Sequence, residues 1–417
     1  LVTELNEMGV KAKQASAVLN TASSSQKNSF FDFAIKEIRS DQELILMANH
    51  QDVAQARDAG KDAAFIDRLE LNHDRLEGIC ATLEEIKLFP DPVGKVLANW
   101  DRPNGLNISR VSTPLGVIGI IFESRPNVAS DAGGLCLKSG NAVILRSGKD
   151  GLRSASALVT AMQKALLKAG LPKESIQIVP SENREAATFM LEGLNGSIDV
   201  IVPRGGKSLV AEVERSAKVP VFGHLEGICH VYVDEHADLK KALEICINAK
   251  MRRTGICGAA ETILLHQKIA TSFGPDLTAK LSSLNCEVRG CTKTLALDQY
   301  VIPAIEEDWS TEYLAPIISI KVVDDAEEAI QHINSYGTGH TESIISEDMN
   351  AQNQFTASID SAIVMINTST QFADGGEFGL GGEIGIATGK FHARGPVGLD
   401  QLTSFKYIVS GDGQIRL

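Results

Sequence analysis

The sequence predicts an α/β protein in which a helical N-terminal segment precedes two parallel sheets, with a small arm interrupting the first. Three observations support this prediction. Apolar residues recur at helical spacing through about the first ninety residues, and short apolar runs alternate with helix-length segments from Leu115 onward. The stretch between these two regions is rich in residues that form turns.

The N-terminal segment is expected to be helical because its apolar residues recur about every 3.6 positions, as at Phe31, Ala34, Ile35 and Ile38. The segment that follows, 91–110, contains prolines, glycines and asparagine that favour tight turns. We therefore expect a hairpin arm there, and we assign it to contact between the subunits of a homo-oligomer.

The first parallel sheet is expected from apolar runs of strand length separated by segments long enough to be helices. These runs cover 115–122, 141–146, 176–179, 198–202 and 220–222. One connecting helix is predicted over 154–169, with Leu158, Met162, Leu166 and Leu167 on one face and Gly170 as its C-terminal stop. Strands that alternate with helices in this way are typical of parallel sheets.

A second α/β set follows, with a strand over 228–233, a helix from its cap at Asp238 through Lys250, and a strand over 261–266. Cys257 is therefore expected on a loop between a helix and a strand. Further along, 371–398 is dense in glycine, which allows the backbone to approach a ligand closely.

Composition restricts the class of protein. A net charge of -13 argues against a nucleic-acid partner, because phosphate backbones are bound by basic surfaces. The longest apolar run, 115–122, is too short to cross a membrane, and the N-terminus lacks a signal-peptide pattern. The seven cysteines follow neither disulfide nor metal-ligand spacing, and Cys286 with Cys291 is at most a weak metal pair. We expect a cytoplasmic protein with reduced thiols and no metal.

Cys257 has the surroundings of a nucleophile. Three basic residues, Lys250, Arg252 and Arg253, lie just upstream, and glycines flank the cysteine. Positive charge favours the thiolate, and glycine lets a substrate carbonyl approach. The alternative is a free cysteine packed as a small apolar residue, and these observations alone leave the two readings even.

An anionic ligand would need local cations to overcome the net negative charge. Two further basic clusters lie beside glycines and strand ends, at 146–149 and 204–207. The second of these precedes a predicted helix, whose N-terminal amides favour a pyrophosphate, although many glycine turns precede helices without binding anything.

Several runs carry a family resemblance. In chain order, 114–119, 125–127, 138–146 and then Cys257 resemble the aldehyde dehydrogenase superfamily. Four longer runs, 123–128, 201–206, 339–344 and 391–396, resemble the γ-glutamyl phosphate reductase family, also called glutamate-5-semialdehyde dehydrogenases. The resemblance implies an aldehyde-dehydrogenase-like fold with two Rossmann-type domains and a small oligomerisation arm. It also implies reduction of L-glutamyl 5-phosphate by NADPH to L-glutamate 5-semialdehyde and phosphate, the second step of proline biosynthesis from glutamate.

The resemblance implies three domain segments and a set of site residues. Residues 1–223 would bind NADP, with the arm at about 91–112, 224–390 would carry the catalytic cysteine, and 391–417 would return to the first domain. Catalysis would use Cys257 to form a thioester and Asn127 to stabilise the oxyanion. The cofactor residues would be Arg146, Ser147, Lys149, Arg204, Gly205, Gly206 and Glu312. The substrate residues would be Arg125, Arg253, His340, His392 and Arg394.

One run departs from the pattern of the oxidative, hydrolysing members. Where they carry a glutamate base, this chain reads His224-Leu225-Glu226-Gly227, and the spacing leaves the roles of His224 and Glu226 open. The absence of that base fits a thioester relieved by hydride or phosphate and not by water. Two alternatives remain open: an NAD(P)-dependent aldehyde dehydrogenase that hydrolyses its thioester, and a nucleotide-binding module with an inert thiol. A third, a cysteine hydrolase with a histidine base, has no supporting motif, and the sequence places no histidine beside Cys257. Because glutamyl phosphate is labile, association with glutamate 5-kinase is also expected.

Overall fold

Five helices form the N-terminal segment, as the sequence predicts. Each buries one apolar stripe, and α2 begins at a capping box made by Ser23 and Gln26. Phe30, Phe31 and Ile38 of that helix are fully buried. The bounds are α1 Val2–Leu19, α2 Ser24–Ser40, α3 Gln42–Asp58, α4 Ala63–Leu69 and α5 His73–Leu88.

The first sheet has four parallel strands in the order β5-β4-β3-β6. The strands are β3 Val117–Phe122, β4 Ala142–Ser147, β5 Ile176–Ile178 and β6 Val200–Arg204. The helices that connect and follow them are α6 Asn127–Lys138, α7 Leu152–Lys168, α8 Arg184–Leu191 and α9 Lys207–Ser216. In α7, Leu158, Met162 and Leu166 are buried as predicted, but the prediction for Leu167 is wrong, because the turn of the helix leaves it exposed. The strand predicted over 220–222 is wrong, since only Val221 makes an isolated bridge, to Ile201. This segment is too short to sustain a ladder.

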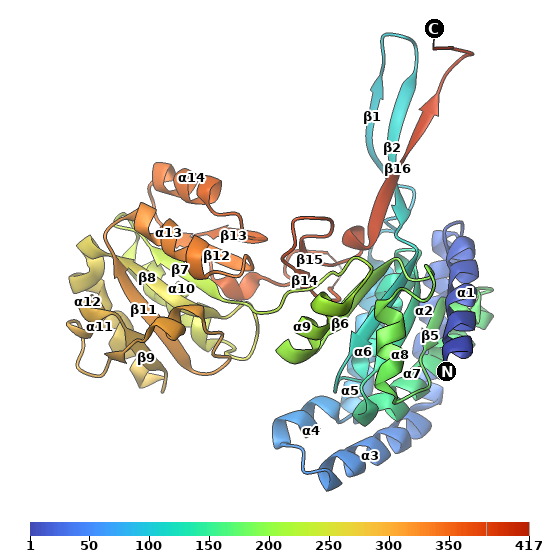
Figure 1. Ribbon diagram of the computed structural model, residues 1–417, viewed down its shortest axis with the longest axis horizontal. Helices are drawn as coiled ribbons and strands as arrows, with labels where there is room; N and C mark the ends of the chain where they lie inside the picture. Colours follow the sequence, from blue (N-terminus) through green and yellow to red (C-terminus); the bar gives the residue numbers. More distant parts are fainter. Residues whose placement is uncertain (381, 417) are drawn as a thin grey trace. The chain divides into compact units, whose positions relative to one another are not determined.

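The predicted hairpin arm is present as β1 Val96–Asp101 paired with β2 Asn107–Pro114. A third strand, β16 Thr403–Ser410, joins it from the far end of the sequence and pairs along the whole of β2. Figure 1 shows this three-stranded sheet extending away from the four-stranded sheet of the same unit. The family resemblance predicted that the C-terminal segment returns to the NADP-binding and oligomerisation region, but nothing local to 403–410 identifies β2 as its neighbour.

The second unit is built on seven parallel strands in the order β10-β9-β11-β8-β7-β12-β13. The strands are β7 Cys229–Val233, β8 Ala260–His266, β9 Glu287–Gly290, β10 Ile302–Pro303, β11 Ile317–Val323, β12 Thr341–Ile345 and β13 Ile363–Ile366. The helices between them are α10 Leu239–Met251, α11 Gln267–Ser283, α12 Thr292–Leu295, α13 Ala326–Tyr336 and α14 Met349–Ser358. The alternation of strand and helix predicted for this region is confirmed.

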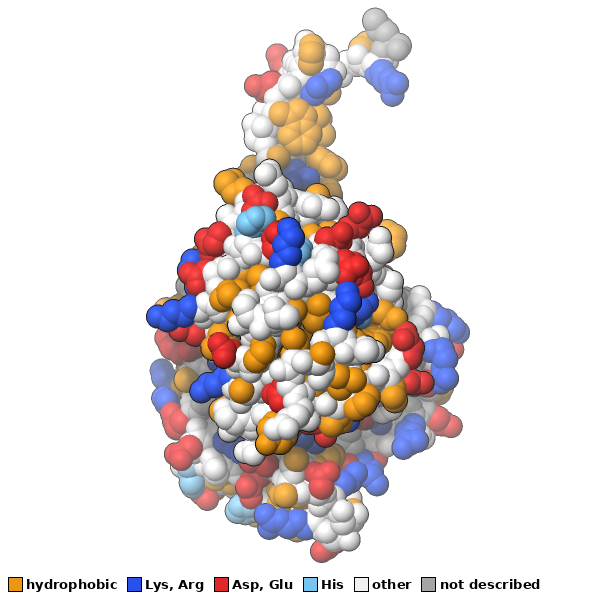
Figure 2. Space-filling model, turned by 90° about the vertical axis from the view of Figure 1, so that its left-hand side faces the viewer, with side chains coloured by type: hydrophobic (Ala, Val, Ile, Leu, Met, Phe, Trp, Pro, Cys, Tyr) orange, Lys and Arg blue, Asp and Glu red, His pale blue; other side chains and the backbone are white. Residues whose placement is uncertain are grey.

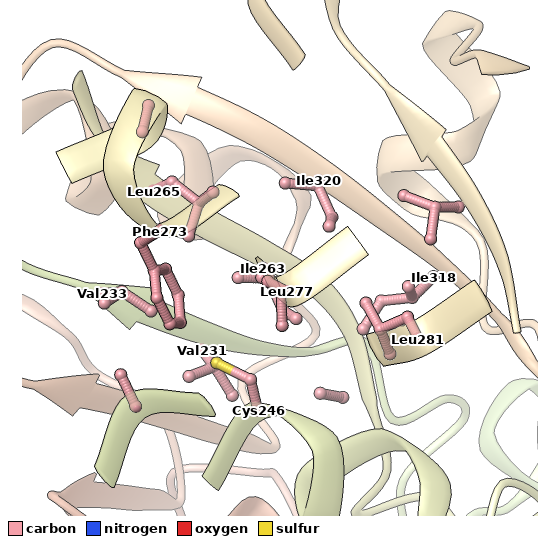
Figure 3. Close-up of a cluster of buried hydrophobic side chains, with 14 of the residues drawn as sticks. Val231, Val233, Cys246, Ile263, Leu265, Phe273, Leu277, Leu281, Ile318 and Ile320 are labelled. Atoms are coloured by element: carbon pink, nitrogen blue, oxygen red, sulfur yellow. The ribbon is translucent and has the colours of Figure 1, made fainter. Parts of the chain in front are cut away.

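Both faces of the seven-stranded sheet are buried. Figure 3 shows Val231 and Ile263 on the face packed against α10 and α11, with Cys246 and Phe273 from those helices. The alternate residues, such as Tyr232, pack on the other face against α13 and α14. On the face of this unit that Figure 2 presents, acidic and basic side chains are interspersed.

The computed structural model describes residues 1–380 and 382–416, in two compact units. The first unit comprises Leu1–Gly223, Gly379–Gly385 and Val397–Leu417, and the second His224–Phe378 and Ile386–Pro396. A single domain boundary after residue 390 therefore needs correction. The short strands β14 Ile386–Ala387 and β15 Gly395–Pro396 pair with each other and stay together in the second unit. Residues 381 and 417 of the predicted domains lie outside the described residues.

None of the helices in the described residues has both the length and the apolar character needed to cross a membrane.

Candidate active site around Cys257

Cys257 lies on the loop between α10 and β8, as predicted. The helix that leads to it is capped by Asp238, whose carboxylate accepts hydrogen bonds from the backbone N–H groups of Lys240 and Lys241. Of the seven cysteines, only Cys257 and Cys291 are not buried. Cys257 is thus partly exposed, on a loop that follows a capped helix.

Lys250 does not act as a cation beside the thiol. It is fully buried and forms an ion pair with Glu261 of β8, while its ammonium lies 5.7 Å from the centre of the Tyr313 ring. Burial raises the pKa of Glu261 to about 7, although the neighbouring Lys250 opposes this shift. Of the three upstream cations, this leaves only Arg252 and Arg253 exposed.

Two histidines lie beside the cysteine. One ring nitrogen from His224, one from His340 and the Sγ atom of Cys257 all lie within 4.8 Å of one another. The two imidazole rings meet edge to face, with centres 4.7 Å apart. His224 Nδ1 lies 2.7 Å from the carbonyl oxygen of Ile386. Because a carbonyl can only accept, Nδ1 carries the proton and the lone pair is on Nε2.

The order of the strands explains this meeting. His224 lies shortly before β7, Cys257 shortly before β8, and His340 directly before β12. These three strands are parallel neighbours in the order β8-β7-β12, so their N-terminal ends reach the same edge of the sheet. The sequence alone placed no histidine near Cys257, because strand order cannot be inferred from spacing along the chain.

His340 is a neutral imidazole. It is fully buried, and burial, with a smaller effect of His224, lowers its pKa to about 3. Its Nδ1 lies 2.8 Å from Thr341 Oγ1 and 3.6 Å from Cys229 Sγ, whereas Nε2 has no hydrogen-bond partner among the described residues. His340 can therefore offer a hydrogen bond or a lone pair beside the thiol, but not a positive charge.

Gly227 and Glu312 hold the segment 224–227 against the cysteine loop. A Cβ atom on Gly227 would lie 2.0 Å from the carbonyl oxygen of Cys257, so only glycine fits there. The Glu312 carboxylate accepts a hydrogen bond of 2.9 Å from the Gly227 N–H. Glu312 was predicted as a cofactor residue, and in the structure its hydrogen bond with Gly227 positions the segment 224–227.

A cavity of about 320 Å³ lies in the second unit near the cysteine loop. Gln371, in its wall, donates hydrogen bonds from Nε2 to the carbonyl oxygens of Ala249 and Arg253, at 2.8 and 3.2 Å. The lining combines a cation, two carboxylates and amides: Glu244, Ile245, Asn248, Arg252, Asn367, Thr368, Ser369, Gln371, Phe372 and Glu377. Arg252, and not the predicted Arg253, faces this cavity.

Apart from Glu312, the predicted cofactor residues lie in the first unit, at the carboxyl ends of β4 and β6, which flank β3. Arg146 and Ser147 end β4 and Arg204 ends β6, while Lys149 is exposed just beyond β4. Gly205 and Gly206 lead into α9, whose N-terminus has no side-chain cap. The predicted helix start after a strand is confirmed. The carboxylate of Glu123 already lies at the N-terminus of α9, where it accepts a 3.4 Å hydrogen bond from the Gly206 N–H.

Asn127 begins α6, after the carboxyl end of β3. Its Nδ2 donates a hydrogen bond of 2.8 Å to Asp131. Burial raises the pKa of Asp131 to about 6, and the bond from Asn127 partly opposes this shift. Asp131 therefore holds the amide of Asn127 in one orientation.

Comparison with known proteins gives the family. The family model described as aldehyde dehydrogenase matches residues 4–293 and 302–408. The chain belongs to the aldehyde dehydrogenase family. Within it, the chain is 57% identical over 410 residues to the gamma-glutamyl phosphate reductase of Brucella suis biovar 1, covering 98% of this chain and 97% of that one. It is 55% identical over 412 residues to the enzyme of the same name from Parvibaculum lavamentivorans, covering 99% and 97%.

Solved structures agree with this assignment. A gamma-glutamyl phosphate reductase from Thermotoga maritima matches with a TM-score of 0.97 and 44% identity, covering 99% of this chain and 100% of that one. An acetylating aldehyde dehydrogenase from Geobacillus thermoglucosidasius, 18% identical, shares the fold with a TM-score of 0.67, covering 100% and 98%. The resemblance seen in the sequence motifs is confirmed, as is the aldehyde-dehydrogenase-like fold.

The remaining predicted substrate residues are Arg394, His392 and Arg125. Arg394 donates two hydrogen bonds to Asp360, one of 2.7 Å to the carboxylate and one of 2.6 Å to the backbone carbonyl oxygen. Lys390 and Arg394 together lower the pKa of Asp360 to about 2. These contacts tie Arg394 to the segment between α14 and β13, and its role toward substrate stays a prediction. His392 and Arg125 are exposed, each in its own unit.

Proposed function

We propose that this chain reduces L-glutamyl 5-phosphate to L-glutamate 5-semialdehyde and phosphate through a thioester on Cys257, in the biosynthesis of proline. The observation that carries the proposal is an accessible thiol with two imidazoles beside it, in a chain 57% identical to a gamma-glutamyl phosphate reductase. The family implies a nicotinamide cofactor. NADPH is our choice, because Arg146 and Lys149 would suit its 2′-phosphate.

The chemistry begins at the sulfur. The Cys257 thiolate attacks the acyl carbon, and the carbon–oxygen bond to phosphate breaks, leaving a thioester. The cofactor, when bound, supplies the hydride that reduces this thioester. The carbon–sulfur bond then breaks to release the aldehyde and regenerate the thiolate. His224 is suited to accept the thiol proton, because the Ile386 carbonyl holds its Nδ1–H and leaves a lone pair on Nε2.

Asn127 is proposed as an oxyanion donor. Its amide nitrogen carries two hydrogens, and Asp131 accepts one of them. The second is proposed to stabilise the negative charge that develops on the substrate oxygen, an interaction whose removal typically costs about 10²–10³-fold in turnover.

The cavity lined by Arg252 is proposed to bind the amino-acid end of the substrate. That end carries a carboxylate and an ammonium group, and the lining offers a guanidinium from Arg252 and carboxylates from Glu244 and Glu377. These charges match the two groups in sign.

The cofactor is proposed to lie along the strand ends of the first unit. The N-terminus of α9 offers backbone N–H groups for a pyrophosphate, with Arg204, Gly205 and Gly206 beside it. The residues present fit such a group, apart from the carboxylate of Glu123 at Gly206.

Three further proposals concern partners and location. The arm is proposed to form a homo-oligomer contact, since it exposes the aromatic residues Trp100, Phe405 and Tyr407. Association with glutamate 5-kinase would protect the labile acyl phosphate. We place the chain in the cytoplasm, where seven free thiols would remain reduced.

The reverse reaction provides the test of function. Glutamate 5-semialdehyde and NADP are mixed with the enzyme, with and without phosphate, and NADPH formation is followed. We expect phosphate-dependent reduction of NADP that Cys257→Ser abolishes. Phosphate-independent turnover that yields glutamate would support the hydrolysing alternative, and full activity in Cys257→Ser would refute the thioester.

A further inference from the structure

The cluster of Cys257, His224 and His340 has a chemistry that the proposed reaction does not use. A thiolate and two imidazoles are the ligand types that Zn²⁺ prefers, and three protein ligands leave a fourth position for water. The three ligand atoms already lie within 4.8 Å of one another. No sequence motif signals the set, because the three residues are brought together only by neighbouring strands.

Hydrogen bonds already orient both imidazoles. The Ile386 carbonyl accepts from Nδ1 of His224, and Thr341 Oγ1 lies 2.8 Å from Nδ1 of His340. Metal-binding histidines commonly have such a partner on the nitrogen that does not bind the metal, because it fixes the ring and the tautomer. In the site proposed below, Nε2 of each ring is assigned to the metal, and Nδ1 keeps its present outer contact.

A second observation, besides the clustering of the three side chains, is that one ring nitrogen of His340 lacks a hydrogen-bond partner among the described residues. This side chain is fully buried, yet its Nε2 has no hydrogen-bond partner among the described residues. Burying a polar atom without a partner is unfavourable, so such an atom points to a ligand or a water. A metal ion on the Cys257 sulfur would satisfy it.

We propose that Cys257, His224 and His340 form a reversible binding site for Zn²⁺, which inhibits the enzyme by occupying its nucleophile. Bonds of about 2.3 Å to sulfur and about 2.0–2.1 Å to nitrogen place tetrahedral ligands roughly 3.3–3.6 Å apart. Small side-chain rotations close the present separation to that range. Binding replaces the thiol proton by the ion, so one proton is released and no oxidant or reductant is needed.

The test measures metal binding directly. Reduced, chelator-treated protein is titrated with Zn²⁺ against a chromophoric chelator, and with Co²⁺ to observe the sulfur-to-cobalt charge-transfer band. We expect one ion per chain, a thiolate band, and slower alkylation of Cys257 by iodoacetamide when Zn²⁺ is bound. Cys257→Ser should remove the band. His224→Ala and His340→Ala should each weaken binding by more than the roughly 10–100-fold that loss of an outer contact costs.

Cys291→Ser is the matched control, since Cys291 is the other cysteine that is not buried. It should leave both the band and the affinity unchanged. Because His340 is buried, its variant is compared by circular dichroism, and the partly exposed His224 supplies an independent test. Unchanged affinity in Cys257→Ser, or loss of the band in Cys291→Ser, would refute the site. Metal binding does not depend on the proposed reaction, so the two can fail separately.

Discussion

The sequence left the role of His224 open, and the structure limits the possible roles by placing its ring beside Cys257. His224 occupies the position where hydrolysing family members have a glutamate, and its ring lies beside Cys257 with the lone pair on Nε2. An imidazole at this place can accept the proton of the Cys257 thiol. This agrees with an enzyme that passes its thioester to hydride.

Replacing His224 with alanine should lower turnover by about 10²–10⁴-fold, because thiolate formation loses its proton acceptor. The loss should shrink as pH rises toward the thiol's own ionisation, which a purely structural defect would not produce. Steady-state rates across pH measure this. His236→Ala, at an exposed position of the same unit, is the control and should retain wild-type rates.

Gly227→Ala tests the close approach of the two loops. The added methyl would lie 2.0 Å from the Cys257 carbonyl oxygen, so the cysteine loop must move. We expect turnover and the rate of Cys257 alkylation to fall together. Gly389→Ala, in the same unit and with no atom within 4 Å of the added carbon, should change neither. Wild-type alkylation in Gly227→Ala would show that the loop tolerates the methyl group.

Buried histidines should make the second unit sensitive to acid. Burial lowers the pKa of both His332 and His340 to about 3, while an unfolded chain protonates histidine near its ordinary value of about 6.5. Between these values the unfolded state binds more protons, so the stabilisation present above about 6.5 is lost as pH falls toward about 3. The slope is about 1.4 kcal/mol per pH unit for each histidine. Urea unfolding at several pH values measures it, and His332→Gln should reduce the slope.

At the scale of secondary-structure elements, the N-terminus of α9 is the feature that bears on cofactor binding. The N-terminus of α9 is the predicted pyrophosphate position, and helix N-termini favour anions. Glu123 places a carboxylate there, within 3.4 Å of the Gly206 N–H. A bound pyrophosphate must displace or repel that charge, which weakens cofactor binding.

Glu123→Gln should therefore lower the KM for NADPH, because it removes a negative charge from the anion position while keeping a similar shape. The effect should diminish at high salt. The control is Glu214→Gln, because Glu214 lies further along α9; this substitution should leave the KM for NADPH unchanged. An unchanged KM in Glu123→Gln would place the pyrophosphate elsewhere.

At the scale of the whole molecule, the arm is the proposed contact between subunits. Its three strands expose aromatic and aliphatic side chains, and Trp100 and Tyr407 meet edge to face with ring centres 6.2 Å apart. Monomeric proteins rarely leave such a patch uncovered. A second copy of the chain is the partner that the family suggests.

Replacing both Trp100 and Tyr407 with lysine should shift the oligomer toward monomer, measured by light scattering after size exclusion. The reason is that two charges replace apolar contact area. Leu167→Lys, at an exposed apolar position of α7, should leave the mass unchanged. An intact oligomer in the double variant would remove the arm from the subunit contact.

The sequence by itself determined the features that local patterns encode. Apolar spacing predicted the N-terminal helices and the strands β3 to β8, but not β9 to β13. Turn residues predicted the arm, and the glycines and cations around Cys257 indicated its loop. Family motifs, read in order, gave the fold and the expected reaction. These features need only neighbours along the chain, which is why they could be predicted.

Only the tertiary structure decided which distant residues meet. It brought His224 and His340 to Cys257 through the order β8-β7-β12, added β16 to the arm, and paired Lys250 with Glu261. Parallel strands can be arranged in many orders with the same local pattern. The order that buries both faces of the sheet is selected by packing over the whole unit, and the contacts of the site follow from it.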